Sequence, residues 1–391
     1  MNKQICILTF SHSEASLCLA KSLALLGYKV DFYFVTDVIK RRGYVAGFDY
    51  RRAPKKCGLV QLMEEHIPEL QSWISNVDLN VFLFAVPLLR KQTDFLIKYY
   101  FRYLGHKLAK KNYDAYNIIG QNNLLIEIHK ALKGKNVIQS FHEVGNHMNG
   151  MFYTPLIKYV ISHQIKTILY SRATYQRFIE HIKSSNHSLV ANIPFGKFET
   201  LLLYRKNVKI KIPLKKASVT FLFVGYIVPY KGLDILCSSM KRLQDIQEKY
   251  NLIIAGAGIV PELNELSKYP NIYIINRYLD NDEMLSLIDS ASCVVMPYKS
   301  ASQSGIIPTV FMMGKPIIAT NVGAIGESVI DMKNGLLVPP NNPDEFADKM
   351  RKVIEDKSLL EKISKGSLTY GHDDEFDWKR ISTKTSNFYF N

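Results

Sequence analysis

Short apolar runs alternate with longer segments of helical periodicity along most of the chain. The runs are rich in Val, Ile, Leu and Phe, which is typical of strands buried on both faces. In the first half the expected strands are Gln4–Phe10, Lys29–Val35, Asn80–Val86, Ala115–Gly120, Asn136–Phe141 and Thr167–Tyr170. In the second half they are Val219–Val224, Leu252–Ala255, Ile272–Ile275, Cys293–Met296, Ile317–Thr320 and Leu336–Val338. Helical patterns lie between several of them; one, Glu14–Leu26, ends at Gly27, which suits a helix C-cap. This alternation predicts α/β domains with parallel sheets.

The alternation is interrupted once, by the Lys-rich segment Tyr204–Ala217. We therefore expect two doubly wound, Rossmann-like domains, residues 1–204 and 218–370, joined by a linker at 205–217. Open α/β sheets bind ligands beyond the carboxyl ends of their strands. With two such domains facing each other, the cleft between them is the expected site.

The composition adds three expectations about class and compartment. With 47% hydrophobic and 22% charged residues, the chain reads as globular, and no apolar run reaches the length of a membrane span. The first residues lack the cleavage pattern of a signal peptide. The five cysteines are scattered without a Cys-x-x-Cys pair, which favours reduced thiols in a cytoplasmic protein over disulfides or a zinc site.

Candidate chemistry lies where strands of the second half end. The segment Ser302–Pro308 places Ser and Gly between a strand and a helical run. Backbone N–H groups of Ser304, Gly305 and Ile306 at a helix start predict an anion site, most naturally for phosphate. Two further loops, Gly225–Lys231 and Gly256–Gly258, also follow strands. Each loop alone is weak evidence, but together they predict a nucleoside diphosphate lying across the strand ends.

These segments resemble the C-terminal domain of family-4 glycosyltransferases, the retaining group with the GT-B fold (glycosyl transferases group 1). The resemblance covers 219–356 and rests on Val224-Gly225-(x)5-Lys231-Gly232, Ile254-Ala255-Gly256-Ala257-Gly258, 314–327 and 334–340. The first half is similar more loosely, through Phe141-His142-Glu143 and 192–196. The tail 371–391 resembles the helix that crosses back to the first domain in that fold.

The resemblance implies transfer of a sugar from a nucleotide-diphosphate sugar to a hydroxyl of an acceptor, with retention of configuration and without metal or other cofactor. Lys231 would stabilise the leaving diphosphate, and His142 would approach the donor sugar. The donor nucleotide and its diphosphate would lie near Arg277, Gly225, Tyr226, Gly256 and Gly258. A lone Lys beside a turn, or a lone His after a strand, is as often structural, so both roles need independent support.

The chain departs from the family pattern at three positions. Tyr226 replaces the Arg that usually follows the first Gly, and Ala301 and Thr309 occupy the positions of two Glu residues. Thr309 can still hydrogen-bond a ribose hydroxyl, and Lys299 can supply positive charge near the diphosphate. These departures keep open a non-catalytic nucleotide-sugar-binding or scaffold subunit.

Charge directs attention to the first half. The net charge is +15, yet residues 1–216 hold 32 Lys and Arg against 14 Asp and Glu, a balance of +18, and the remainder is slightly acidic. Two segments, 40–56 and Phe95–Lys111, mix basic and aromatic residues. The side chains expected to face an anionic membrane and the acceptor are Lys40, Arg41, Arg42, Arg51, Arg52, Tyr99 and Arg102. The alternative for each segment is a core helix or loop with a solvated basic face.

The sequence therefore predicts a glycosyltransferase of surface polysaccharide (lipopolysaccharide or capsule) assembly, acting on a lipid-linked glycan as a peripheral protein of the cytoplasmic membrane face. Nucleic acid is disfavoured as a partner, because no nucleic-acid motif is present and residues 217–391 are acidic in balance.

Overall fold

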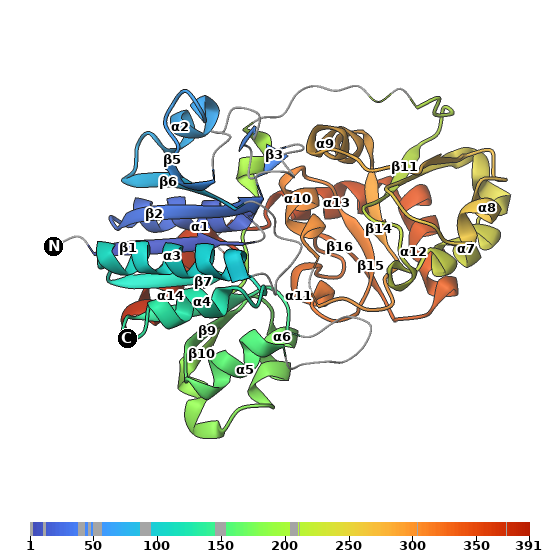
Figure 1. The fold of residues 1–391 in the computed structure, drawn as a ribbon. Coiled ribbons are helices and arrows are strands. Elements are labelled where there is room, and N and C mark those ends of the chain that lie inside the picture. Colours follow the sequence, from blue (N-terminus) through green and yellow to red (C-terminus); the bar gives the residue numbers. More distant parts are fainter. Residues whose placement is uncertain are drawn as a thin grey trace. The chain divides into compact units, whose positions relative to one another are not determined.

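The alternation seen in the sequence is present as two separate sheets in the computed structural model (Figure 1). The structure describes residues 3–10, 13–37, 44–45, 48–49, 57–86, 95–144, 154–203, 210, 212–302, 304–372 and 374–391. The chain divides into an N-terminal unit, residues 1–204 with 373–391, and a C-terminal unit, residues 205–372.

The N-terminal unit is built on an eight-stranded sheet of order β10-β9-β8-β7-β1-β2-β6-β5. Its strands are β1 (Gln4–Thr9), β2 (Lys29–Asp37), β5 (Gly58–Gln61), β6 (Leu79–Val86), β7 (Ala115–Ile119), β8 (Val137–Phe141), β9 (Lys166–Leu169) and β10 (Val190–Asn192). All pairs are parallel except β5 with β6, and the separate hairpin β3 (Tyr44–Val45) and β4 (Phe48–Asp49) is antiparallel. The N-terminal sheet is therefore doubly wound around β1.

Helices bury the two faces of this sheet in two apolar clusters. The helices are α1 (Ser13–Leu25), α2 (Pro68–Ile74), α3 (Phe95–Lys111), α4 (Leu125–Ala131), α5 (Pro155–Ser162), α6 (Arg172–Ile179) and α14 (Trp378–Phe390). One cluster joins α1, α2 and α14 to the sheet, and the other joins α3, α4, α5 and α6. Helix α14, from the far end of the sequence, packs beside α1 (Figure 1). Its Ile381 and Tyr389 are buried, so residues 374–391 complete the core of the N-terminal unit.

The C-terminal unit has a six-stranded sheet of order β13-β12-β11-β14-β15-β16, and every pair is parallel. Its strands are β11 (Val219–Val224), β12 (Tyr250–Ala255), β13 (Ile272–Ile275), β14 (Cys293–Met296), β15 (Ile317–Thr320) and β16 (Gly335–Val338). Its helices are α7 (Leu233–Arg242), α8 (Glu262–Leu266), α9 (Asn281–Ser290), α10 (Ile306–Met312), α11 (Ile325–Ser328), α12 (Pro343–Glu355) and α13 (Lys357–Leu368). The chain moves outward from β11 in one direction and then returns to β14, so the order reverses between these two strands.

The fold prediction is confirmed: both units are α/β with parallel sheets, and all twelve expected strands are present within two residues of the expected ends. Gly27 ends α1 with a positive φ of 91°, as its position after the helix predicts. The short strands β5 and β10 and the hairpin were not anticipated. Across the described ranges, no helix is long and apolar enough to cross a membrane.

Candidate nucleotide site at the strand ends of the C-terminal unit

The candidate site lies where the strand order of the C-terminal sheet reverses, beyond the carboxyl ends of β11 and β14. Ligands of doubly wound folds bind at such a reversal, beyond the carboxyl ends of the strands. The loop after β11 runs through Gly225 to Gly232, and the loop after β14 runs from Pro297 to Gly305. Both loops were predicted from the sequence, and the topology brings them together.

Glycine makes the close approach of these two loops possible. Gly232 has a φ of 71°, and a Cβ at this position would lie 1.8 Å from the Pro297 carbonyl oxygen. Any larger residue would therefore separate the loops. The backbone N–H of Lys299 also donates to the Tyr230 carbonyl at 2.8 Å. The two loops form one connected surface.

Lys231 occupies the centre of this surface. A Cβ at Gly225 would lie 2.7 Å from Lys231 Nζ, so the ammonium rests directly against the glycine. The same Nζ lies 5.2 Å from the centroid of the Tyr298 ring. Within the described residues, no ion pair joins this ammonium to a carboxylate. Burial lowers the pKa of Lys231, and the neighbouring Tyr230 offsets this only in part. A half-buried cation without a carboxylate partner is a suitable contact for an anion.

Lys299 is placed differently from Lys231, although both lie in these loops. Its Nζ forms an ion pair with Asp234 Oδ2 at 2.6 Å, and Asp234 is on α7. The charge of Lys299 is therefore already balanced within the protein. Among the described residues of these two loops, Lys231 is the lysine whose charge no carboxylate balances.

The loop after β12 packs against the loop after β11 through its glycines. A Cβ at Gly256 would lie 1.9 Å from the Gly225 carbonyl oxygen, and one at Gly258 would lie 1.9 Å from that of Ile227. The Ile227 N–H also donates to the Ala257 carbonyl at 2.9 Å. The Gly-x-Gly pattern therefore has a packing role in addition to any contact with a nucleotide.

The loop after β14 opens into the short helix α10, which has seven residues. Gly305 is exposed and Ser304 half-buried. The helix start at Ile306 has no side-chain cap. The Ile307 N–H already donates to the Ser304 carbonyl at 3.2 Å, so the N–H groups of Gly305 and Ile306 are those that a ligand could contact. Burial raises the pKa of the Tyr298 hydroxyl, and the hydrogen bond with Ser304 opposes this. Thr309 is buried, and its hydroxyl donates to the Gly305 carbonyl at 3.4 Å.

Three exposed apolar or aromatic side chains follow three neighbouring strands of this sheet: Tyr226 after β11, Ile259 after β12 and Tyr278 after β13. Tyr226 was predicted to contact the donor nucleotide, and the residue is 62% exposed. Ile259 and Tyr278 were not singled out from the sequence. Arg277, also after β13, makes two hydrogen bonds to Glu283, of 2.8 and 2.6 Å. Exposed side chains at adjacent strand ends can flank a nucleobase.

His142 belongs to the N-terminal unit, where it follows β8. Its ring is buried and lies 4.6 Å from the ring of Phe195 and 4.7 Å from that of Tyr170. Phe195 comes from the segment 192–196 that was linked to His142 by resemblance. The two predicted catalytic residues thus lie in different units. His142 is stacked with Phe195 and Tyr170, and Lys231 lies at the candidate nucleotide site.

The predicted membrane-facing residues divide between described and undescribed parts of the chain. Lys40, Arg41, Arg42, Arg51 and Arg52 lie outside the described residues. Tyr99 and Arg102 are on the exposed face of α3, and Arg102 donates two hydrogen bonds to Glu127, of 3.1 and 2.7 Å. In the parts of the chain that are described, no group of three or more His, Cys, Asp or Glu residues has the arrangement of a metal site.

Comparison with known proteins gives this geometry a context. Residues 218–356 match the family described as Glycosyl transferases group 1. An uncharacterized glycosyltransferase of Methanocaldococcus jannaschii is 30% identical over 168 residues, 41% of this chain and 44% of the relative. The chain thus spans about half the length of the curated relatives it matches.

Solved structures are similar over nearly the whole chain. A glycosyltransferase from Rickettsia africae superposes with a TM-score of 0.65 at 15% identity, covering 99% of this chain and 98% of that one. HepE of Anabaena, solved in complex with UDP, gives a TM-score of 0.64 at 16% identity and covers 99% of both chains. At this identity the likeness establishes the fold, which is the GT-B fold of these glycosyltransferases.

Proposed function

Because residues 218–356 form a Glycosyl transferases group 1 domain, we propose that this protein is a glycosyltransferase that uses a nucleotide-diphosphate sugar as donor. The observation that carries the proposal is the Lys231 ammonium, half-buried at the reversal of the strand order and held against Gly225. A diphosphate at the candidate site would pair with the Lys231 ammonium, which has no carboxylate partner among the described residues. Similarity to HepE, which was solved with UDP, makes UDP the first nucleotide to test.

In the proposed reaction the bond between the sugar and the β-phosphate oxygen breaks, and negative charge grows on the leaving diphosphate. Lys231 stabilises that charge, and the backbone N–H groups at Gly305 and Ile306 add to this stabilisation. The acceptor hydroxyl oxygen forms the new glycosidic bond to the anomeric carbon, and its proton passes to an oxygen of the leaving diphosphate. We propose that configuration is retained and that no metal takes part, since Lys231 supplies the positive charge at the diphosphate.

A thermal-shift panel of UDP, GDP, ADP, CMP and dTDP tests the donor site. One nucleoside diphosphate should raise the melting temperature by mass action, and its sugar conjugates become the donors to assay. The Lys231→Ala variant should lose the shift. A flat panel for the wild-type protein at millimolar concentrations would contradict the proposal.

We further propose that the acceptor is a glycan attached to a membrane lipid, in surface polysaccharide assembly at the cytoplasmic membrane face. Helix α3 supports a peripheral membrane contact. Its side chains Ile97, Phe101 and Leu104 are buried in the unit, whereas Phe95 is 79% and Tyr99 59% exposed. The helix contains no Asp or Glu and carries five basic residues. Arg102 pairs with Glu127 and Lys111 with Asp31, so Lys98, Lys107 and Lys110 are the cations that we expect to face the lipid. Exposed aromatic rings beside cations suit an anionic lipid surface.

Sedimentation with vesicles tests this contact. Phe95→Ser/Tyr99→Ser should bind phosphatidylglycerol vesicles several-fold more weakly than wild type, whereas Met63→Ser, an exposed apolar residue outside α3, should not. Equal binding of all three proteins, or equal binding to phosphatidylcholine vesicles, would contradict the role of α3.

A non-catalytic nucleotide-sugar-binding subunit is the second candidate. It is favoured by two observations: Tyr226 stands where the family usually has Arg, and Lys299 is already paired with Asp234. Binding of a nucleotide without transfer or hydrolysis of any of its sugar conjugates would support this alternative.

A further inference from the structure

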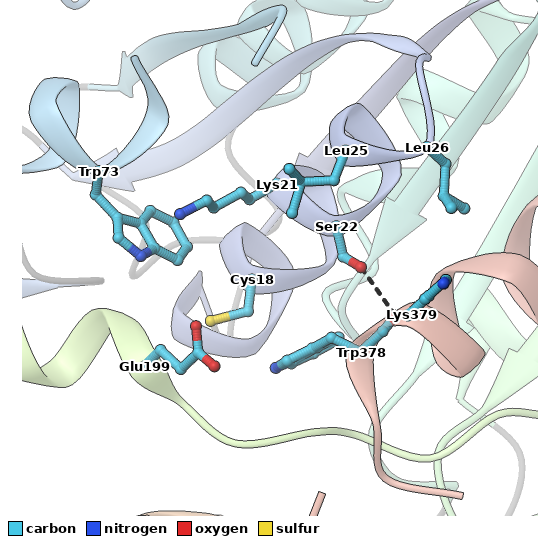
Figure 2. A pocket seen from close by; sticks show the side chains of 9 residues that line it. All are labelled: Cys18, Lys21, Ser22, Leu25, Leu26, Trp73, Glu199, Trp378 and Lys379. Atoms are coloured by element: carbon cyan, nitrogen blue, oxygen red, sulfur yellow. Dashed lines mark hydrogen bonds between the residues drawn. The ribbon is translucent and has the colours of Figure 1, made fainter. Parts of the chain in front are cut away.

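A second cavity, of about 290 Å³, lies entirely within the N-terminal unit (Figure 2). Helix α1, α2, the 3₁₀ turn Glu199–Leu202 and α14 each contribute to its walls. Its lining residues are Cys18, Lys21, Ser22, Leu25, Leu26, Trp73, Glu199, Trp378 and Lys379. The volume is close to the lower end of the range for small-molecule sites, about 300–1,000 Å³.

Both tryptophans of the chain line this cavity. Each ring is only partly buried, so an apolar surface remains available on two sides of the cavity. In Figure 2 the Lys21 side chain points toward Trp73, and Trp378 and Glu199 lie across from them. Two large rings that border one small cavity offer apolar contact area to a ligand, although the Lys21 ammonium covers one face of the Trp73 ring.

The position of Trp378 is fixed by contacts on several sides. Its indole N–H donates to the Lys197 carbonyl at 2.9 Å, and Ser22 Oγ donates to the Trp378 carbonyl at 2.8 Å. A Cβ at Gly196 would lie 2.6 Å from Trp378 Cε2, so the ring packs directly on this glycine. A ring held in this way is preorganised, which reduces the entropy lost when a ligand binds.

Three charged side chains line the cavity together with the rings: Lys21, Glu199 and Lys379. Lys21 Nζ lies 4.0 Å from the centroid of the Trp73 ring, and Lys379 lines the same cavity. Glu199 is exposed, and in the described part of the chain its carboxylate makes no hydrogen bond or ion pair. The cavity therefore offers both hydrogen-bond donors and an acceptor beside apolar ring faces.

The two indole rings, the two lysines and the carboxylate together favour some classes of ligand over others. An acyl chain would contact the rings but would make no use of the hydrogen-bonding groups of Lys21, Glu199 and Lys379. A quaternary ammonium would suit rings and a carboxylate, but two lysines would repel it. A sugar ring has an apolar C–H face for an indole, and its hydroxyl groups can both donate to Glu199 and accept from the lysines.

The cavity is also separate from the carboxyl edge of the N-terminal sheet. Helix α1 starts beyond the carboxyl end of β1 and runs back toward the start of β2, so Lys21, Leu25 and Leu26 lie toward the amino ends of the strands. His142 follows β8 at the opposite edge. A ligand in the cavity does not occupy that edge.

We propose that this cavity is a non-catalytic binding site for one sugar residue of a glycan chain. The choice of a glycan as ligand rests on the proposed function, whereas the site itself rests on the two tryptophans, the carboxylate and the lysines. A chain held here stays close to the enzyme between successive encounters with the active site, because tethering raises its local concentration.

Tryptophan fluorescence tests the proposal directly, because the only two tryptophans of the sequence report on this cavity. The probes are maltohexaose, cellohexaose, chitohexaose and mannohexaose, added to the full-length protein. At least one should cause a saturable change in emission. Glu199→Gln should weaken this binding about tenfold, the size expected for one hydrogen bond to a charged group. Glu180→Gln, an exposed carboxylate outside the cavity, is the matched control and should bind like wild type.

Trp73→Ala should abolish sugar binding, and the melting temperature of this variant shows whether its fold is intact. If Trp73→Ala does not fold, the comparison of Glu199→Gln with wild type still tests the proposal. No saturable response to any of the four sugars overturns the proposal, as does a response to octanoate alone. A protein that shows the nucleotide thermal shift but no sugar response retains the proposed transferase function and lacks this site. A protein that responds to a sugar but shows no nucleotide thermal shift has this site, and the proposed transferase function is then contradicted.

Discussion

At the scale of single residues, the proposed transfer reaction depends most on Lys231. Lys231→Ala should reduce kcat/KM at least tenfold, because the growing charge on the diphosphate loses its closest cation. The fold should be unaffected, since within the described structure no ion pair holds this ammonium. Transfer assays with the donor found by thermal shift give the measurement. Activity equal to wild type would remove Lys231 from the mechanism.

The buried surroundings of Lys231 predict a pH dependence. Burial lowers the pKa of Lys231, so the ammonium loses its proton at lower pH than an ordinary lysine, whose pKa is about 10.4. Nucleotide affinity should therefore fall as pH rises through the lowered pKa. Lys231→Arg keeps its charge and should lose this alkaline decline. Titration calorimetry of both proteins across this pH range measures the difference, and an equal decline in both would assign it to another group.

At the scale of elements, the contact of Gly232 with Pro297 allows the loops after β11 and β14 to pack against each other. Gly232→Ala places a methyl group against the Pro297 carbonyl and strains a residue with a φ of 71°. The free energy of unfolding should fall by about 3 kcal/mol or more, and nucleotide binding should be lost.

Gly27→Ala is the matched control for that change. Gly27 also has a positive φ, of 91°, but a Cβ there meets no atom within 4 Å. It should cost only the backbone strain, about 1–2 kcal/mol, and leave nucleotide binding intact. Equal effects of both substitutions in chemical denaturation would show that strain alone, and not the loop contact, matters at Gly232.

The elements of the fold follow from the sequence to a large extent, because a parallel sheet buried on both faces produces continuous apolar runs. Every expected strand is such a run. Strand β10 has three residues, only one of them buried, and β5 is a half-buried edge strand, so neither produces that signal. The candidate nucleotide site was predicted for the same reason: strand-end loops and glycines are visible locally. The pairing of Lys299 with Asp234 was not predicted, because it joins the loop after β14 to helix α7, and only the sheet order brings these two segments together. The cavity of the two tryptophans was missed because its walls come from four distant segments.

At the scale of the whole molecule, the two units have separate sheets and cores, and the two proposed ligand sites lie in different units. Both tryptophans lie in the N-terminal unit, whereas Lys231 lies in the C-terminal unit. Tryptophan emission therefore follows unfolding of the N-terminal unit alone. Calorimetry follows both units.

A nucleoside diphosphate should therefore stabilise one unit more than the other. We expect calorimetry to resolve two transitions and the nucleotide to raise the one that tryptophan emission does not follow, because binding stabilises the unit that holds the ligand. Lys231→Ala should remove this shift without changing the emission-detected transition. Glu199→Gln serves as the converse control: it should leave the nucleotide-dependent shift unchanged. A single transition that moves as a whole in both measurements would show that the units unfold together, and would assign the two sites to one cooperative structure.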